Sequence, residues 1–276
     1  MTGFDAQPLL ATGTVAVWDV VCEGTCKHKS AEECAAATHM VFPYRGVYVH
    51  HTGRVEAVAE PNQVVFINGD EAYRVSHPVE GGDSSLSVEV NAATLFELAP
   101  ANYLQVNGRP AFTRSRLRID ASVQALATLL RHGLTRGVIE ALEAESLTLG
   151  LLRRALGERT SRAAAGSVGC QKLVDRAKLV LSSDLERRWT LAAIAADVGV
   201  SPIYLTQVFQ QVEGLPLYRY QLQLRLARAL DLLGEHVDLT RLALDLGFSS
   251  HSHFSAAFRR AYGQTPSEFQ RSARVR

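Results

Sequence analysis

The chain of 276 residues is long enough for two domains, and its 47% hydrophobic and 21% charged residues suit ordinary folded cores. It has no run of about 18 apolar residues and no basic, apolar leader, so we expect a cytosolic protein without a membrane span or secretory signal. The net charge is +1, but residues 1–169 carry −3 and residues 170–276 carry +4, which favours a polyanionic partner for the C-terminal part.

The first 115 residues have the pattern of short strands. They are rich in β-branched and aromatic residues, and turn-forming stretches such as "EPNQ" and "EGGDS" separate them. Such spacing predicts a β-barrel or sandwich, and a small barrel encloses a pocket suited to a ligand. The expected strands cover residues 14–22, 46–52, 63–68, 72–77 and 86–90.

After Ile119 the period becomes helical. Helices expected over 120–132 and 135–158 form a hairpin, and a small, polar, glycine-bearing stretch follows. An apolar stripe on the second helix either packs onto the barrel or forms the seam of a homodimer. The stripe contains Ile139, Leu142, Leu149, Leu152 and Leu156. The predicted organisation is a β-rich domain with this helical hairpin over 1–157, a linker over 158–169 and a second domain over 170–276.

The C-terminal part contains one sequence unit twice. Residues 191–214 match residues 239–263. Matching residues are 48 positions apart up to Gly199 and Gly247, and 49 apart after the turn, where the second copy has one extra residue. In each unit a short helix precedes a glycine that permits a left-handed turn, and a second helix follows. Ser201 and the proline after it supply an N-cap and a first helical residue. The buried face of the second helix carries Leu205 and Phe209 in one unit, and Phe254 and Phe258 in the other.

Two such units joined by a long helix at 216–233 predict a double helix-turn-helix domain. Residues 172–271 resemble the DNA-binding domain of the AraC/XylS family of bacterial transcription regulators, above all in "GFSSHSHFSAAFRRAYGQTPSEF", where Thr265 and Glu268 form a capping box. Residues 42–78 are similar to the cupin-like sensor domains of that family. The expected fold class is therefore α+β, with a cupin-like β-barrel and helical hairpin before an all-α double helix-turn-helix domain.

The resemblance implies a one-component regulator that binds double-stranded promoter DNA, works with RNA polymerase and dimerises. Ile203 and Gln207 match positions that commonly read bases, and Ser252 and Ala256 match them in the second unit. Gln207 suits adenine, whereas Ala256 suits only a thymine methyl group. The remaining candidates on the two second helices are Thr206, Gln210, Gln211, His251 and Ser255.

Arginines of the C-terminal part are candidates for phosphate contacts, because guanidinium groups bind phosphate oxygens in two-pronged fashion. Some of them must instead form ion pairs within the helical bundle, so we expect about half of them to touch DNA. The candidates are Arg219, Arg225, Arg228, Arg259 and Arg260.

Two other functions have some support. A catalytic cupin metal needs histidines that share one face, but His50 and His51 are adjacent and point to opposite faces of a strand, although Glu56 and His77 lie within reach of one of them. An alkyl-accepting repair regulator would use four clustered cysteines, and three cluster here. We therefore expect a regulator, not an enzyme, whose effector is a small molecule, a metal or a thiol-reactive signal.

The cluster "CEGTCKHKSAEEC" contains Cys22, Cys26 and Cys34, with His28 and His39 near enough to complete four ligands. Three cysteines and one histidine form a common zinc site, although this spacing matches no standard motif. We expect Zn²⁺ bound by Cys22, Cys26, Cys34 and His39, or a reactive thiol sensor, or buried thiols without a function. Cys170 is expected in the core of the C-terminal domain.

Overall fold

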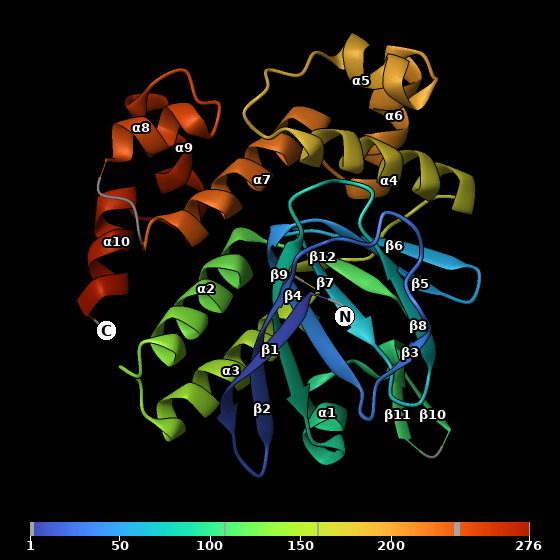
Figure 1. Ribbon diagram of the computed structural model, residues 1–276, viewed down its shortest axis with the longest axis vertical. Helices are drawn as coiled ribbons and strands as arrows, with labels where there is room; N and C mark the ends of the chain where they lie inside the picture. The colour runs from blue at the N-terminus through green and yellow to red at the C-terminus, as the bar shows by residue number, and fades with distance from the viewer. Residues whose placement is uncertain (1–2, 108, 159, 235–237, 276) are drawn as a thin grey trace. The chain divides into compact units, whose positions relative to one another are not determined.

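The computed structural model describes residues 3–107, 109–158, 160–234 and 238–275, and the chain divides between Ala163 and Ala164 into two compact units. The strands and the first three α-helices belong to the first unit, and α4 to α10 belong to the second (Figure 1). The linker predicted over 158–169 is therefore too long. Ser161 and Arg162 form a short strand that pairs with Ile119 and Arg118, and a helix already begins at Val168.

The larger sheet of the first unit has seven strands in the order β1-β2-β9-β4-β7-β12-β13. All of its adjacent strands pair antiparallel. Its strands are β1 (Phe4–Ala11), β2 (Val15–Cys22), β4 (His39–Gly46), β7 (Gln63–Ile67), β9 (Asp83–Val90), β12 (Arg116–Ile119) and β13 (Ser161–Arg162).

A second sheet has four strands in the order β3-β8-β5-β6, and β10 and β11 form a separate hairpin. The first unit is thus built from two sheets and a hairpin, in agreement with the β-rich N-terminal domain of the expected α+β fold class. These strands are β3 (Glu33–Cys34), β5 (Tyr48–Thr52), β6 (Val55–Ala59), β8 (Ala72–Ser76), β10 (Leu104–Asn107) and β11 (Arg109–Phe112).

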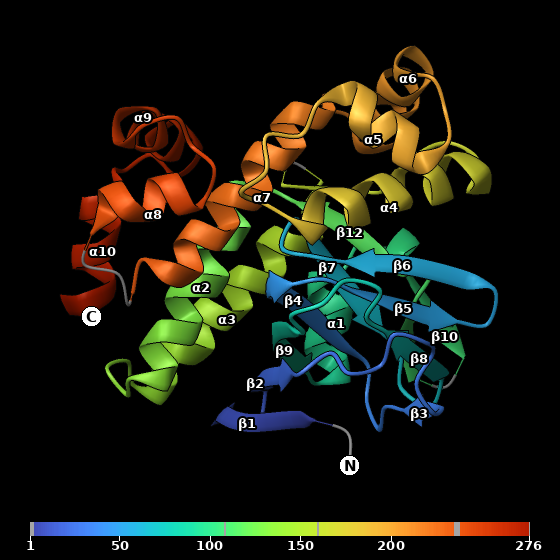
Figure 2. The ribbon, with the colours of Figure 1, turned by 45° about the horizontal axis from the view of Figure 1, so that its top comes forward.

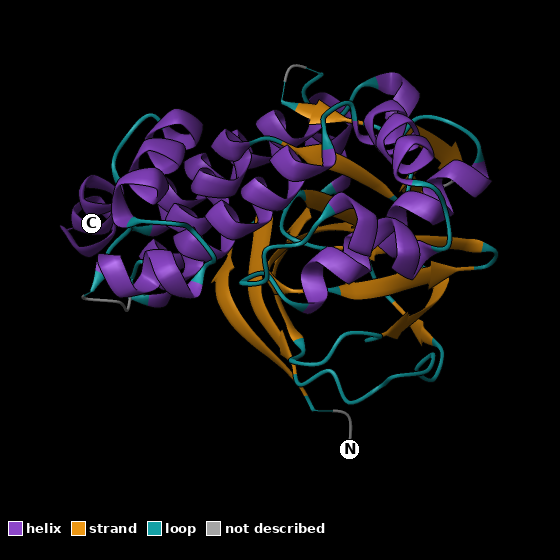
Figure 3. Ribbon diagram, turned by 90° about the horizontal axis from the view of Figure 1, so that it is seen from above, coloured by secondary structure: helices purple, strands orange, loops and turns teal. Residues whose placement is uncertain are grey.

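The two faces of the larger sheet bury different cores, because successive side chains of a strand point to opposite faces. Met40, Phe42 and Val64 pack into the main core with residues of the helices. Val41 and Val65 pack on the other face with residues of the four-stranded sheet. Strands such as β4 and β7 are therefore buried on both faces. Figure 3 distinguishes the strands of the first unit from the helices by colour.

The helices of the first unit are α1 (Ala92–Leu98), the 3₁₀ turn Ala101–Tyr103, α2 (Ala121–Thr135) and α3 (Ala141–Leu156). The apolar stripe proposed as a dimer seam is mostly core in this structure. Leu152 and Leu156 are 0% and 1% exposed in the main core, while Leu149 and Ile139 are partly buried against it. Ile139 precedes the helix, which begins at Ala141. Leu142, 78% exposed, is the stripe residue that stays on the surface.

The second unit consists of helices, and its turns follow the sequence prediction. Gly199 and Gly247 have φ of 74° and 76°, and the Ser201 hydroxyl accepts a hydrogen bond from the Tyr204 N–H at 3.2 Å. The helices are α4 (Val168–Ser183), α5 (Leu191–Val198), α6 (Pro202–Glu213), α7 (Leu217–Leu232), α8 (Leu239–Asp245), α9 (His251–Tyr262) and α10 (Pro266–Val275).

Two hairpins, α5–α6 and α8–α9, lie at opposite ends of the long helix α7 (Figure 2). The axes of α5 and α6 meet at 86°, as in a helix-turn-helix. The capping box before α10 is present, since the Glu268 carboxylate accepts from the Thr265 N–H at 2.7 Å. No single helix in the described residues has the length and apolarity to cross a membrane, although the bent pair α5–α6 passes that test on length and composition.

A buried ion pair fastens α6 to α4. The Lys178 ammonium, with a fully buried side chain, lies 2.6 Å from the Glu213 carboxylate and 3.7 Å from that of Asp175. The same ammonium lies 5.3 Å from the centre of the Tyr220 ring on α7. Removing one partner of such a pair leaves an uncompensated charge in the interior, so this cluster holds the first hairpin in a fixed geometry.

Candidate DNA interface and ligand pocket

The second helix of the first hairpin, α6, has one buried and one exposed face. Leu205 and Phe209 are 0% exposed in the core of this unit, as the sequence predicted. Ile203 is 73% exposed, so its side chain is free to contact a partner. The other candidates on this helix are also exposed, namely Thr206, Gln207, Gln210 and Gln211.

The second helix of the other hairpin, α9, repeats the arrangement. Phe254 and Phe258 are fully buried, whereas Ser252 and Ala256 are exposed. His251 and Ser255 are half-buried, and the Ser255 hydroxyl lies 3.3 Å from the His251 Nε2 atom. This face therefore offers small side chains, together with the histidine, to whatever lies against it.

The candidate arginines divide into two groups. Arg219, Arg259 and Arg260 are exposed, and a hydrogen bond to the Tyr218 hydroxyl raises the pKa of Arg219. Arg228 is half-buried and forms an ion pair with Asp231 one turn further along α7. The sequence made Arg228 a candidate for phosphate binding, and in the structure its guanidinium has this carboxylate partner within the unit.

Arg225 on α7, a phosphate candidate from the sequence, uses its guanidinium for contacts within the unit. Its guanidinium donates to the carbonyls of Leu185 at 2.7 Å and Arg187 at 2.9 Å, in the loop before α5. It also donates to the Gly247 carbonyl at 3.0 Å, in the turn of the second hairpin. Burial lowers the pKa of this guanidinium, and its donors hold the two hairpins to the linking helix.

Two hairpins with exposed second helices, the first with its helix axes at 86°, define a double helix-turn-helix DNA-binding domain. A helix-turn-helix domain model matches residues 194–272. The chain therefore carries an AraC-family helix-turn-helix domain at its C-terminal end, as DNA-binding transcriptional regulators do.

Named relatives include LumQ, a probable transcriptional regulator of Photobacterium leiognathi, which is 26% identical over 84% of this chain and 92% of LumQ. GadX of Escherichia coli K12, an HTH-type transcriptional regulator, is 35% identical over 33% of each chain. The alignment with GadX therefore spans about one third of that relative. A crystal structure of an AraC-type regulator from Chromobacterium violaceum is 32% identical, with a TM-score of 0.37, over 39% of this chain and 96% of that one.

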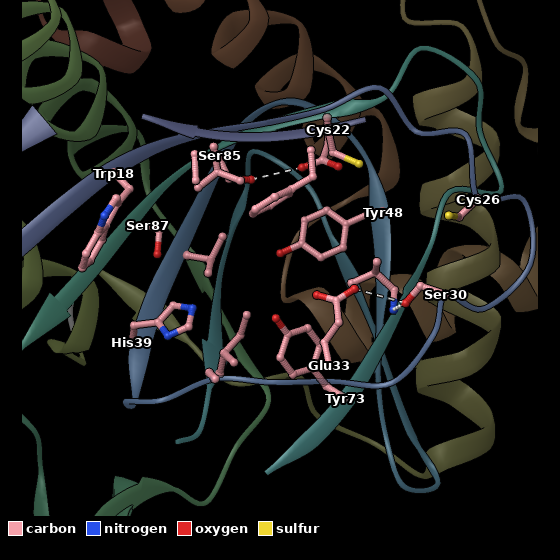
Figure 4. Close-up of a pocket in the computed structure, with 18 of the residues that line it drawn as sticks. Trp18, Cys22, Cys26, Ser30, Glu33, His39, Tyr48, Tyr73, Ser85 and Ser87 are labelled. Carbon is pink, nitrogen blue, oxygen red and sulfur yellow. Dashed lines mark hydrogen bonds between the residues drawn. The ribbon is translucent and has the colours of Figure 1, made fainter. Parts of the chain in front are cut away.

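The first unit encloses a pocket of about 430 Å³ between the two sheets (Figure 4). Trp18, Tyr48 and Tyr73 contribute aromatic surface, and Glu33 and Glu89 contribute carboxylates. The lining residues in the described part of the chain include no lysine or arginine. The pocket is therefore mainly apolar, with an excess of negative charge.

Burial sets the protonation of several pocket groups. It raises the pKa of the Tyr48 hydroxyl well above its ordinary value, and nearby Asp83 acts in the same direction. It also lowers the pKa of His39, although the Ala37 carbonyl opposes this shift by accepting a hydrogen bond at 3.0 Å. At neutral pH, Tyr48 and His39 are therefore uncharged, which leaves the carboxylates as the dominant charges.

The structure does not bring the four predicted zinc ligands together. Cys22 and Cys26 lie at one end of the pocket and His39 lies across it (Figure 4), while Cys34 is exposed on β3. The reason is that the chain after Cys22 runs as an extended loop around the pocket before it reaches the short strand β3.

The residues that do meet at Cys22 are His77 and Asp83, with one ligand atom of each within 4.8 Å of the others. His77 Nε2 lies 2.7 Å from Asp83 Oδ1. Burial raises the pKa of the Cys22 thiol. The sequence analysis missed Asp83, although its position directly after two glycines signals a close approach of backbones.

The histidines considered for a catalytic cupin metal point apart, as the sequence predicted. The His50 ring packs 5.1 Å from the Tyr73 ring, measured between centroids. The His51 ring lies 2.8 Å from the Ser76 hydroxyl and 3.3 Å from the Glu56 carboxylate. His77 joins neither of them, since it pairs with Asp83. In the described residues these groups do not form a shared metal site.

Cys170 lies in the first turn of α4, the first helix of the second unit, and is partly buried against the core of that unit. Its surroundings are those of a small hydrophobic side chain.

Proposed function

We propose that this regulator binds promoter DNA with α6 and α9 in successive segments of the major groove, and that its first unit senses an effector. The observation that carries the DNA part is the exposed face of α6, on which Ile203 is 73% exposed beside exposed Gln207. Ile203 suits a thymine methyl group, and Gln207 suits the two hydrogen-bonding atoms of an adenine edge. Ser252 and Ala256 take the corresponding positions on α9.

Arg219, Arg259 and Arg260 support the proposal because they are exposed, whereas Arg228 and Arg225 have partners within the unit. Exposed arginines bind phosphate without reading sequence. The docked protein would then work through RNA polymerase, in the cytoplasm where promoter DNA lies.

The DNA contacts can be tested on an operator selected from random DNA, with a scrambled duplex alongside. Gln207→Ala should weaken binding to the operator by about 1–3 kcal/mol and relax one base position, while scrambled DNA binding changes little. Gln105→Ala, the same change at an exposed residue of the first unit, is the matched control. Equal losses on both duplexes would mean that Gln207 touches only the backbone.

Phosphate contacts give a different signature. Arg259→Ala should weaken binding to both duplexes alike and reduce the slope of log affinity against log salt by about 1. Arg54→Ala, at an exposed arginine of the first unit, should leave the slope unchanged. An unchanged slope for Arg259→Ala would remove that residue from the interface.

We propose the pocket of the first unit as the effector site. Its volume of about 430 Å³ lies within the range of small-molecule sites, which is roughly 300–1,000 Å³. Aromatic walls with Glu33 and Glu89, and no lysine or arginine among the described lining residues, favour an apolar molecule with a cationic or hydrogen-bond-donating end.

Phenethylamine and 3-phenylpropionate are a matched pair of probes, because they share a ring and differ in charge. The amine should change the fluorescence of Trp18, which lines the pocket, whereas the carboxylate should not. Trp18→Phe should abolish the signal and so separate it from Trp189 in the other unit. Tighter binding of the carboxylate would contradict the charge argument.

We propose a homodimer, although not through the whole stripe. Leu142 is 78% exposed and Val138 is 49% exposed, so both are accessible to a second copy. Leu142→Asp should then shift sedimentation toward the monomer without loss of fold. An unchanged dimer would place the interface elsewhere.

We also propose that the chain acts as a regulator and not as an enzyme. The support is that His50 and His51 point apart and bond to different partners.

A further inference from the structure

Cys22, His77 and Asp83 gather at one wall of the pocket. One ligand atom of each lies within 4.8 Å of the other two. His77 is 2% exposed and Asp83 is 5% exposed, and all three residues line the cavity. Neither DNA binding nor the proposed effector contacts with Glu33 and Glu89 use this cluster.

Strand pairing explains why these residues meet. Cys22 ends β2 and stands directly opposite Asp83, the first residue of β9, so both side chains project from the same face of the larger sheet. Gly82 permits the close approach, because a Cβ atom there would lie 2.1 Å from the Cys22 carbonyl oxygen. His77 follows β8 of the other sheet, and its backbone N–H donates to the Cys26 carbonyl at 2.7 Å.

The cluster has unused coordinating capacity. His77 Nε2 lies 2.7 Å from Asp83 Oδ1, but the Nδ1 atom is buried and has no hydrogen-bond partner in the described structure. The Ser85 hydroxyl lies 3.4 Å from the other Asp83 oxygen and can orient the carboxylate from outside the cluster. Because the two ring nitrogens point in nearly opposite directions, an ion shared with Asp83 would bind Nε2 in place of its proton, and Nδ1 stays available for an orienting hydrogen bond.

We propose that Cys22, His77 and Asp83 bind one divalent transition-metal ion of the zinc type, with a further coordination position facing the pocket. A thiolate, an imidazole and a carboxylate suit zinc or cobalt better than calcium or magnesium. The thiolate and the carboxylate together balance the two charges of the ion. The Cys22 thiol gives up its proton to solvent when the ion binds. Such an ion would connect the two sheets at this end of the pocket.

Cobalt(II) is a suitable probe because a cobalt–thiolate bond absorbs in the near ultraviolet. The full-length protein is first stripped with a chelator and then titrated with Co²⁺. We expect a thiolate-to-cobalt charge-transfer band that saturates at one ion per chain. Cys22→Ser should abolish the band, and Asp83→Asn should weaken binding by about tenfold or more. No effector or DNA is needed, so the outcome is independent of the proposed function.

The matched controls are Cys26→Ser and Cys34→Ser, which should leave the cobalt band intact. Absence of the band in the wild-type protein would overturn the proposal. So would loss of the band in Cys34→Ser as large as in Cys22→Ser, because this would restore the site expected from the sequence. Circular dichroism of each variant checks its fold.

A second measurement uses the wild-type protein and does not depend on any variant folding. Zn²⁺ should slow alkylation of Cys22, mapped by mass spectrometry, while exposed Cys34 stays as reactive as before. Equal reactivity of Cys22 with and without Zn²⁺, or equal protection of both cysteines, would refute the three-residue site.

Discussion

Arg225→Ala should destabilise the second unit without changing how its affinity for DNA depends on salt. The guanidinium makes three hydrogen bonds of 2.7 to 3.0 Å to the carbonyls of Leu185, Arg187 and Gly247. A bond from a charged donor contributes about 1.5–3 kcal/mol. The three bonds share one half-buried charge, and in the alanine variant water can reach some of the carbonyls that lose their donor. We therefore expect the free energy of unfolding to fall by about 2–4 kcal/mol in total.

The assay is urea unfolding followed by the fluorescence of Trp189 in a Trp18→Phe background. The Trp189 indole N–H donates to the Asp184 carbonyl at 2.9 Å, and the Arg187 guanidinium lies 4.0 Å from its ring. The reporter therefore sits in the loop that Arg225 holds. The midpoint should fall while the dependence of the unfolding free energy on urea stays constant.

Two variants make the result interpretable. Arg225→Lys keeps the charge but not the planar fork, so it should recover little of the loss. Arg260→Ala removes an exposed arginine and should change stability by no more than about 0.5 kcal/mol. A loss below about 0.5 kcal/mol for Arg225→Ala, combined with a salt slope reduced by about 1, would show that the residue binds phosphate after all.

Three further predictions concern stability. Burial lowers the pKa of His50 from 6.5 to about 4, so between these pH values the unfolded chain binds more protons than the folded one, and the free energy of unfolding should fall by roughly 3 kcal/mol as the pH drops through this range. His50→Gln should flatten the dependence of the unfolding free energy on pH there, and an equally steep dependence in this variant would show that His50 is not its cause. Leu156→Asp should unfold the first unit, since Leu156 is 1% exposed, and a folded monomer by sedimentation and circular dichroism would argue against this packing. Glu213→Gln should cost about 3–5 kcal/mol in urea unfolding by stranding the Lys178 ammonium, and adding Lys178→Met should recover much of that; no recovery would count against the ion pair.

The second unit was predictable because its signals are local. Gly199, Gly247 and Ser201 fix the turns through their own backbone preferences, and the repeat doubles the evidence. Arg225 was not predictable in this way. Its acceptors, Leu185 and Gly247, come from two loops far apart in the chain, and nothing in the sequence marks a free carbonyl.

The first unit was harder to predict because its strands differ in how they are buried. The strands expected over 14–22, 46–52, 63–68, 72–77 and 86–90 correspond to β2, β5, β7, β8 and β9, but β1, β3, β4, β6 and β10 to β13 were missed. Strand β4 is buried on both faces, so it shows no alternation, and Pro43 within it reads as a strand breaker. Strand β1 pairs with β2 alone at the sheet edge, and most of its residues are exposed. Strands β7 and β9 are also buried along both faces, but turn-forming stretches bound their runs of β-branched residues, which made them recognisable.

The cysteines show the same limit at the level of a site. Spacing along the chain groups Cys22 with Cys26 and Cys34, but antiparallel pairing sets Cys22 against Asp83. A shift of one residue in that register would turn Asp83 to the other face of the sheet and dissolve the cluster with His77. Close cysteines in sequence predict a metal site only when they lie on one turn or loop that curls around the ion. Here the segment is extended along the pocket, so register between β2 and β9, and not spacing, determines which donors meet.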